Sequence, residues 1–170
     1  MEKVAEQVRT DTVYIGIGDL AMVSAPGILV SLGLGSCIAL VIYSPKKKLA
    51  AMAHIMLPDS PDPREGKEFK VGKFADKAVP AMVKMFEERG IKSKELRAKF
   101  AGGAKMFMFS SSPAMAIGEK NISRITELLN AFSITVEGSD TGGAKGRSVT
   151  FRIETCELEV RTVGRQPKSL

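Results

Sequence analysis

Residues 28–57 read ILVSLGLGSCIALVIYSPKKKLAAMAHIML, and this stretch decides the fold of the core. It holds two apolar runs, residues 37–43 and 49–57, separated by a Ser-Pro-Lys-Lys segment that suits a hairpin connection. Aliphatic and β-branched runs of this length indicate strands, and Pro58 ends the second because it cannot donate a ladder hydrogen bond. Strands joined by a tight turn run antiparallel, so we predict that residues equidistant from the turn lie opposite each other.

Cys37 and His54, the only histidine of the chain, are close to equidistant from this turn. Cys37 lies where a glycine-rich turn, residues 33–36, becomes a strand. A thiol and an imidazole in contact can share a proton at neutral pH as thiolate and imidazolium, because their ordinary pKa values are about 8.5 and 6.5. The spacing therefore favours a cysteine nucleophile with a histidine base.

Each of these two residues also has a purely structural interpretation. A lone cysteine in an apolar strand is commonly a small buried hydrophobe, and a half-buried histidine is commonly satisfied by a backbone carbonyl group. Gly33 and Gly35 favour catalysis, because a glycine turn can direct successive N–H groups at one oxyanion. A third group must orient the imidazole, and the hydroxyl groups of Ser31 and Ser36 are both candidates.

The rest of the chain combines further strands with two helices. Helical spacing of apolar residues covers 71–89 and 117–132, and Pro80 is expected to kink or restart the first helix. The other segments with strand character are residues 12–17, 28–32, 96–101, 134–137, 148–154 and 157–163. We expect a flexible N-terminal segment at residues 1–11, one domain at 12–164 and a C-terminal tail at 165–170.

Composition limits the class of protein. A chain of 170 residues, 44% of them hydrophobic, is long enough for one compact domain. No apolar run approaches the roughly 20 residues of a membrane helix, so we expect a cytoplasmic protein without membrane insertion. The formal charge of +6 is spread along the chain, which disfavours a nucleic-acid-binding stripe. With two cysteines and one histidine, we expect no cofactor, no metal site, and free thiols at Cys37 and Cys156.

Other motifs match known signatures only in part. Gly33-x-Gly35 begins like a dinucleotide fingerprint, but Ile38 stands at the third glycine position and a strand follows it. Residues 140–143, Asp-Thr-Gly-Gly, are typical of a turn. Cys156 has no histidine near it in the sequence, which indicates a structural residue.

Five sequence blocks together carry a family resemblance. The most specific are LGLGSC at residues 32–37 and AHIMLPDS at 53–60; the others are AGGAKMF at 101–107, IGEKN at 117–121, and DTGG at 140–143 with GRS at 146–148. In these blocks the chain resembles the CheD family of chemoreceptor glutamine deamidases. The resemblance implies a protein-glutamine glutaminase of the Cys-His type, with Cys37 as nucleophile and His54 as general acid and base. It implies Ser31 as the orienting hydroxyl, where family members commonly carry threonine.

The resemblance also implies a fold, a mechanism and partners. The fold is of the α/β (α+β) class, a single layered α/β/β domain with mixed, largely antiparallel sheets and two main helices, similar to deamidating-toxin catalytic domains. N–H groups around Gly35, Ser36 and Cys37 would hold the oxyanion. The partners are the cytoplasmic helices of methyl-accepting chemoreceptors and a CheC-type phosphatase. We take Met106, Phe107 and the loop after them as candidate contacts, with packing in the core as the alternative for Phe107. The alternative function is a non-catalytic adaptor that binds receptors and acts on chemotaxis through CheC.

Overall fold

Two five-stranded sheets form the centre of the structure, a computed structural model that describes residues 10–106 and 117–170. In spatial order, the first sheet contains β1 (Thr12–Tyr14), β3 (Ile28–Leu34), β8 (Arg147–Arg152), β9 (Glu157–Thr162) and β10 (Lys168–Ser169). The second contains β2 (Leu20–Ser24), β5 (Leu49–Ile55), β4 (Ile38–Ser44), β6 (Arg97–Gly102) and β7 (Thr135–Thr141). Only the pairs β1–β3 and β6–β7 are parallel, so both sheets are mixed and largely antiparallel.

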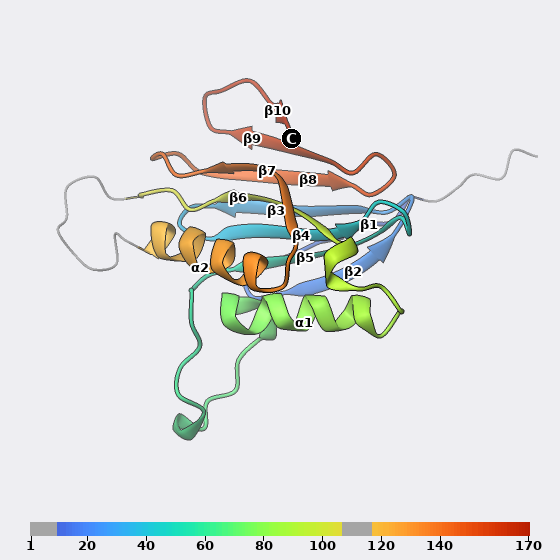
Figure 1. Ribbon diagram of the computed structural model, residues 1–170. Coiled ribbons are helices and arrows are strands. Elements are labelled where there is room, and N and C mark those ends of the chain that lie inside the picture. Colours follow the sequence, from blue (N-terminus) through green and yellow to red (C-terminus); the bar gives the residue numbers. More distant parts are fainter. Residues whose placement is uncertain (1–9, 107–116) are drawn as a thin grey trace, which may run out of the picture.

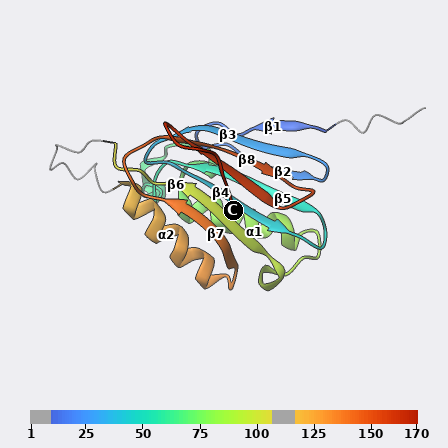
Figure 2. The ribbon, with the colours of Figure 1, turned by 90° about the horizontal axis from the view of Figure 1, so that it is seen from above.

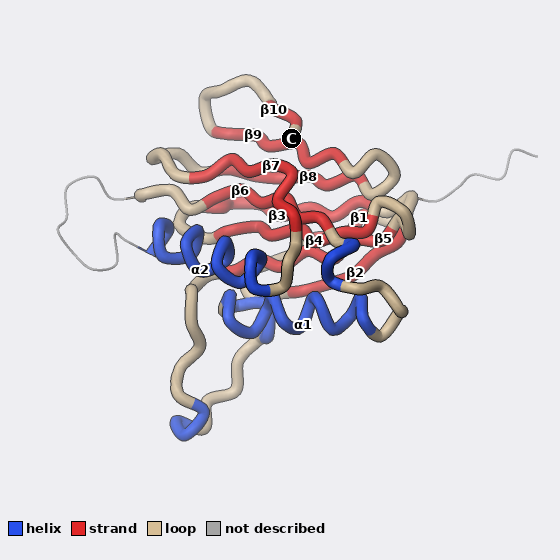
Figure 3. The backbone as a smooth tube through the Cα atoms, viewed as in Figure 1, coloured by secondary structure: helices blue, strands red, loops and turns tan. Residues whose placement is uncertain are grey.

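Two helices, α1 (Ala75–Glu87) and α2 (Ile117–Ala131), lie on one side of the strands (Figures 1 and 3). Seen from above, the two sheets overlap, α1 lies partly beneath them, and α2 runs along their edge beside β7 (Figure 2). One hydrophobic cluster joins the helices to the second sheet, and another fills the space between the sheets. The expected layered α/β/β fold is therefore confirmed.

Strand β4 is buried on both faces, which explains its unbroken apolar sequence. Ile38, Leu40 and Ile42 face the helices, whereas Ala39 and Val41 face the other sheet. Successive side chains of a strand point to opposite faces, so position 37 lies on the same side as Ala39. The cysteine that precedes β4 consequently belongs to the space between the two sheets, where it packs against the second cluster.

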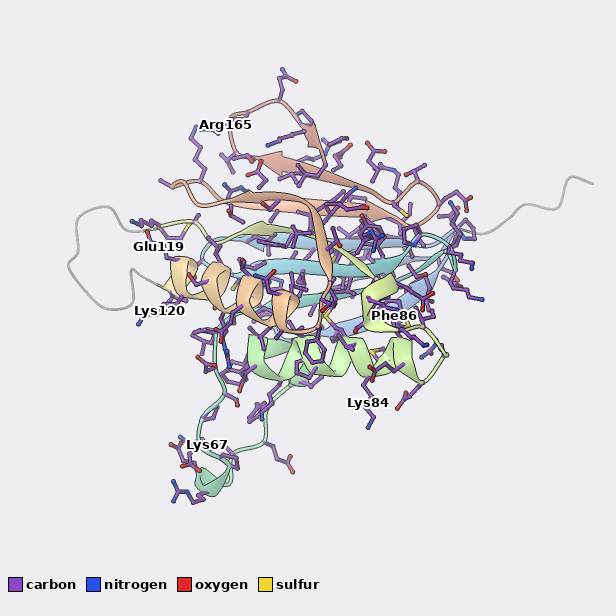
Figure 4. The ribbon with its side chains drawn as sticks, viewed as in Figure 1. Lys67, Lys84, Phe86, Glu119, Lys120 and Arg165 are labelled. Carbon is purple, nitrogen blue, oxygen red and sulfur yellow. The ribbon has the colours of Figure 1, made fainter. Side chains whose placement is uncertain are left out.

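The first helix differs in detail from the sequence prediction. Residues 71–73 form a separate 3₁₀ turn, and α1 begins only after Phe74, whose backbone is extended. The helix then continues through Pro80 to residue 87 without the expected restart. Short 3₁₀ turns at residues 63–65 and 93–95 interrupt the connections on either side. Lys67 lies near the tip of the connection that projects away from the helices (Figure 4).

The chain ends contain one strand that the sequence did not indicate. Residues 168–169, within the segment assigned to a tail, pair with β9 as β10, and Leu170 packs against the cluster between the sheets. Arg165 lies in the loop between β9 and β10 (Figure 4). Of the segment 1–11 that was expected to be flexible, residues 1–9 lie outside the described residues.

Candidate active site

The imidazole of His54 is held by a hydroxyl group from the other sheet. His54 lies on β5, and its Nδ1 atom is 2.9 Å from the Oγ atom of Ser31 on β3. The Ser31 hydroxyl donates its single hydrogen to the carbonyl oxygen of Ile15, also at 2.9 Å. The Oγ atom must therefore accept from Nδ1–H, which places the ring proton on Nδ1 and leaves a lone pair on Nε2.

The Nε2 atom of His54 is buried and has no hydrogen-bond partner in the part of the chain that the structure describes. The residue as a whole is 2% exposed. A buried polar atom without a partner is costly, so it requires an explanation such as a catalytic role. Of the two serines that the sequence left open, Ser31 is the one whose hydroxyl contacts the ring.

Cys37 lies diagonally across from His54. The ladder between β4 and β5 pairs Ala39 with His54 and Ile38 with Ile55, so the register differs by two residues from direct opposition of Cys37 and His54. Diagonal neighbours on one face of a sheet have Cα atoms about 7–8 Å apart, within reach of larger side chains. The thiol and the imidazole thus share a face but form no hydrogen bond in this state. Catalytic hydrogen bonds often shorten only when substrate binds.

Burial shifts the pKa values of this pair. Burial raises the pKa of the Cys37 thiol above its ordinary 9.0. A hydrogen bond from the residue's own N–H group lowers this pKa, but its effect is smaller. Burial lowers the pKa of the His54 imidazole below 6.5, although the Ile15 carbonyl and the Asp19 carboxylate oppose that shift. Both shifts favour the neutral forms. Burial of the two groups therefore opposes the thiolate–imidazolium form that a thiol and an imidazole in contact can adopt.

Residues 33–37, called the cysteine turn below, are held by hydrogen bonds from the backbone of Gly103 and Ala104. The carbonyl oxygen of Gly35 accepts from the N–H of Ala104 at 2.9 Å, and that of Cys37 accepts from Gly103 at 3.0 Å. The N–H groups of Ser36 and Cys37 donate to no other residue in the described ranges. Within those ranges, both N–H groups are available for an oxyanion, the role that was predicted for the N–H groups around Gly35, Ser36 and Cys37.

Gly102 and Arg147 hold the neighbouring backbone close to this turn. A Cβ atom at Gly102, which has a φ of 125°, would lie 2.1 Å from the carbonyl oxygen of Cys37. Only glycine allows this approach. The guanidinium of Arg147 donates to the carbonyl oxygens of Gly102 at 3.1 Å and Gly142 at 2.7 Å, and its Nε atom is 3.0 Å from an oxygen of Asp140. Asp140 thus anchors this region from within β7, where the sequence predicted only a turn.

A cleft of about 390 Å³ adjoins the cysteine turn. It is lined by Gly103, Lys105, Glu119, Gly142, Gly143 and Ala144. Lys105 and Glu119 form an ion pair of 2.6 Å, and Figure 4 places Glu119 at the start of α2. A larger cleft, of about 470 Å³, lies at the opposite end of β4, around the turn at residues 44–47. The smaller cleft is connected to the cysteine turn through Gly103, whose N–H donates to the Cys37 carbonyl oxygen.

Sequence reasoning missed Asn121, Arg147 and Gly102 as parts of this region. Asn121 is fully buried on α2 and donates hydrogen bonds to the carbonyl oxygens of Ser36 and Met56. Asn and Arg within amphipathic segments are usually exposed, so only their presence in the family-like blocks could have indicated a role. Both cysteines are free thiols, as expected.

The described residues contain no cluster suited to a metal ion, defined as three or more His, Cys, Asp or Glu side chains. In the same residues, 10–106 and 117–170, no helix is long and apolar enough to cross a bilayer. Met106, one of the two candidate partner contacts, is 48% exposed and lies against Gly35. Phe107, the other, lies outside the described residues.

Comparison with known proteins identifies a family. Residues 56–162 match the model of the family CheD, described as CheD chemotactic sensory transduction. This match begins just after His54, so it does not include the residues of the Cys-His pair. Similarity to individual relatives extends over most of the chain and therefore includes the region of Cys37 and His54.

Three relatives are each named chemoreceptor glutamine deamidase CheD. The one from Thermotoga maritima is 47% identical over 150 residues, covering 88% of this chain and 91% of the relative. That from Halalkalibacterium halodurans is 41% identical and covers 94% and 99%; that from Bacillus subtilis is 38% identical and covers 93% and 95%. Among solved structures, YfiH of Bacillus licheniformis aligns with a TM-score of 0.47 and 14% identity, over 72% of this chain and 50% of that one.

Proposed function

The chain belongs to the CheD family, and from this premise we propose that it deamidates glutamine side chains of chemoreceptors to glutamate, with release of ammonia. The relatives that support this proposal are glutamine deamidases by name. We place the activity in one domain, residues 12–164, acting in the cytoplasm on the cytoplasmic helices of methyl-accepting receptors. The finer proposal is that Cys37, His54 and Ser31 perform the reaction.

One observation carries this assignment: the Ser31 hydroxyl fixes the proton of His54 on Nδ1 and leaves Nε2 as an unpartnered base on the face shared with Cys37. Because burial favours the neutral thiol, His54 Nε2 takes its proton as sulfur attacks the side-chain amide carbon of the substrate. The carbonyl oxygen becomes an oxyanion beside the N–H groups of Ser36 and Cys37.

The reaction is completed in two further steps. The imidazolium of His54 gives its proton to the amide nitrogen, the C–N bond breaks, and ammonia leaves behind a γ-glutamyl thioester on Cys37. His54 then removes a proton from water, which attacks the thioester carbon. The thiolate leaves, recovers its proton from His54, and the receptor retains a glutamate with one more negative charge.

The proposal is tested by incubating purified chemoreceptor with the protein and measuring receptor peptides by mass spectrometry. Replacement of –NH2 by –OH adds about one dalton per modified glutamine, and one equivalent of ammonia is released for each. A receptor glutamyl methyl ester should be hydrolysed as well, because it presents a similar carbonyl with a better leaving group. Receptor glutamines that stay intact with active, folded protein would contradict the proposal.

The adaptor remains the second candidate function, and one observation favours it. Burial raises the pKa of Cys37, and a thiol with a raised pKa is less reactive in the absence of a base. Cys37→Ala distinguishes the two, since an adaptor would bind receptor and act on chemotaxis equally well without the thiol. Receptor binding that persists in Cys37→Ala while deamidation is lost would assign the protein as an enzyme.

We include a CheC-type phosphatase as a partner in this proposal. The exposed side chain of Met106 lies against Gly35 of the cysteine turn, so a protein bound there would cover the entrance to the site. CheC and receptor would then compete, and the free concentration of one would set the apparent affinity of the other. Titration of a fluorescent receptor peptide with and without CheC measures this competition; independent binding would exclude a shared surface.

A further inference from the structure

Asn121 is a fully buried polar residue that the reaction steps above do not use. It lies on α2, is 0% exposed, and donates from Nδ2 to the carbonyl oxygens of Ser36 and Met56, both at 3.0 Å. Its Oδ1 atom is buried and forms no hydrogen bond with the described residues. A buried acceptor without a partner opposes folding, so packing alone does not explain an asparagine here. Its two donated hydrogen bonds are the feature to explain.

The bond to Ser36 controls the direction of the Cys37 N–H group. The Ser36 carbonyl and the Cys37 N–H belong to one peptide unit, and in a trans peptide they point in opposite directions. Since Asn121 holds the oxygen toward α2, the N–H must point away from that helix. This N–H group belongs to the residue that carries the attacking sulfur, so its direction bears on where an oxyanion can form.

Among the described residues, Asn121 is the one side chain that donates a hydrogen bond to a carbonyl group of this turn. Backbone N–H groups of Ala104 and Gly103 bind the carbonyl oxygens of Gly35 and Cys37, whereas the Ser36 carbonyl between them depends on the asparagine amide. A hydrogen bond to a peptide oxygen also polarises the peptide and strengthens its N–H as a donor. The orientation and the strength of the oxyanion donor both depend on this amide.

The second bond joins the cysteine turn to the strand that carries His54. Met56 follows the end of β5, and the register Ile38–Ile55 places Met56 opposite Cys37, at the position where the ladder stops. At this position Asn121 donates to the carbonyl oxygens of Ser36 and Met56, where a further pair of the strand ladder would otherwise lie. It therefore fixes the distance between the turn that carries the thiol and the strand that carries the imidazole.

We propose that Asn121 is a positioning residue for the deamidation, which sets the Cys37 N–H as an oxyanion donor by holding the Ser36 carbonyl. This inference rests on the proposed function. The amide must donate twice and accept nothing, so neither Leu nor Asp can replace it: Leu has no donors, and an ionised Asp presents oxygens to two carbonyl oxygens.

The experiment compares two reactions of the same thiol. Deamidation forms an oxyanion, whereas alkylation of Cys37 by iodoacetamide is a displacement that forms none. In Asn121→Leu we expect kcat for receptor deamidation to fall by about 10- to 100-fold, less than the loss of a whole oxyanion donor, with KM and the alkylation rate unchanged. Asn130→Ala, at an exposed position of the same helix, is the matched control and should retain both rates.

Three outcomes would overturn the inference. Deamidation equal to wild type in Asn121→Leu would show that the amide does not act, and a parallel loss of deamidation and alkylation would show that it only supports the fold. If Asn121→Leu does not fold, Asn121→Ser carries the same comparison, because its hydroxyl can donate one hydrogen bond and we expect a smaller loss of kcat. Wild-type protein without deamidase activity would instead remove the proposed function itself, and with it this inference.

Discussion

Buried polar groups are hydrogen-bonded near the Tyr43 end of β4, whereas one of them lacks a partner among the described residues near the Cys37 end. At the Tyr43 end, the hydroxyl of Tyr43 donates to Glu137, which also pairs with Arg97 at 3.4 Å. Lys99 donates to the carbonyl oxygens of Cys156 and Leu170 at 2.6 and 2.8 Å. At the Cys37 end, Nε2 of His54 is left without a partner among the described residues. Satisfied polar groups stabilise a fold, whereas an unsatisfied buried group requires an explanation such as a ligand or a reaction, so this contrast supports the proposed site.

The two cysteines offer the strongest test of this contrast. Cys37 lies at the unsatisfied end, while the thiol of Cys156 at the other end donates weakly to the Ile153 carbonyl at 3.6 Å. We expect Cys37→Ala to lower kcat for receptor deamidation by about 10⁴-fold or more, as for other nucleophiles, and Cys156→Ala to leave it unchanged. Mass spectrometry of receptor peptides measures both. Equal effects of the two substitutions would remove the distinction between the two ends.

His54→Gln should have the next largest effect. The glutamine amide cannot accept and return the thiol proton, so we expect kcat to fall by about 10³-fold, in the range of general acid–base catalysis. Steady-state deamidation at several receptor concentrations separates this loss from a change in KM. Activity within a few-fold of wild type would exclude His54 as the base.

Ser31→Ala should lower kcat about tenfold, because the imidazole loses the group that fixes its proton on Nδ1. The conservative variant Ser31→Thr retains the hydroxyl and should retain activity, with a χ1 angle that is more restricted. The buried Ser44, at the opposite end of β4, provides the control as Ser44→Ala. A loss of activity in Ser44→Ala equal to that in Ser31→Ala would indicate a general effect on the fold.

The pH dependence tests the burial of the pair. Burial lowers the pKa of His54, so its neutral form persists to lower pH, and the acidic midpoint of kcat/KM should lie below pH 6.5. Below the lowered pKa, kcat/KM should fall about tenfold per pH unit as the base is protonated. The alkylation rate of Cys37 should still rise above pH 9.0, because burial raises the thiol pKa. An activity midpoint above 6.5 would contradict the lowered pKa of His54.

Tyr43→Phe should have the smallest effect on catalysis and a measurable one on stability. Burial, followed by the Glu137 carboxylate, holds the pKa of Tyr43 above its ordinary 10.0, so the hydroxyl stays protonated and donates. Loss of this bond should lower the free energy of unfolding by about 1–2 kcal/mol with kcat unchanged. Urea denaturation measures the first quantity and the deamidation assay the second. A fall in kcat would show that the two ends of β4 are coupled.

The sequence predicted most of the elements because their apolar spacing is regular. The runs that became β4 and β5, and the helical stripe of α2, are long enough for periodicity to define them within a few residues. It missed β10, since two residues carry no period, and it misplaced the start of α1, where 3₁₀ and α turns share the same apolar spacing. The hairpin predicted at the Ser-Pro-Lys-Lys segment agrees with the observed register, in which Ser44 pairs with Leu49. Cys37 and His54 are only close to equidistant from the turn, so the ladder places them diagonally opposite each other.

By itself, the sequence determined which residues could do the chemistry: a single histidine, a cysteine after a glycine turn, and hydroxyl groups close by. It also determined that Cys37 and His54 come from neighbouring strands. Only the tertiary structure decided that Ser31 rather than Ser36 contacts the imidazole, that burial shifts the pKa values of both members of the pair toward the neutral forms, and that Asn121 binds the turn. The physical reason is that these properties depend on contacts between two sheets and a helix, and on the water that those contacts exclude. Local spacing along one chain segment carries no information on either.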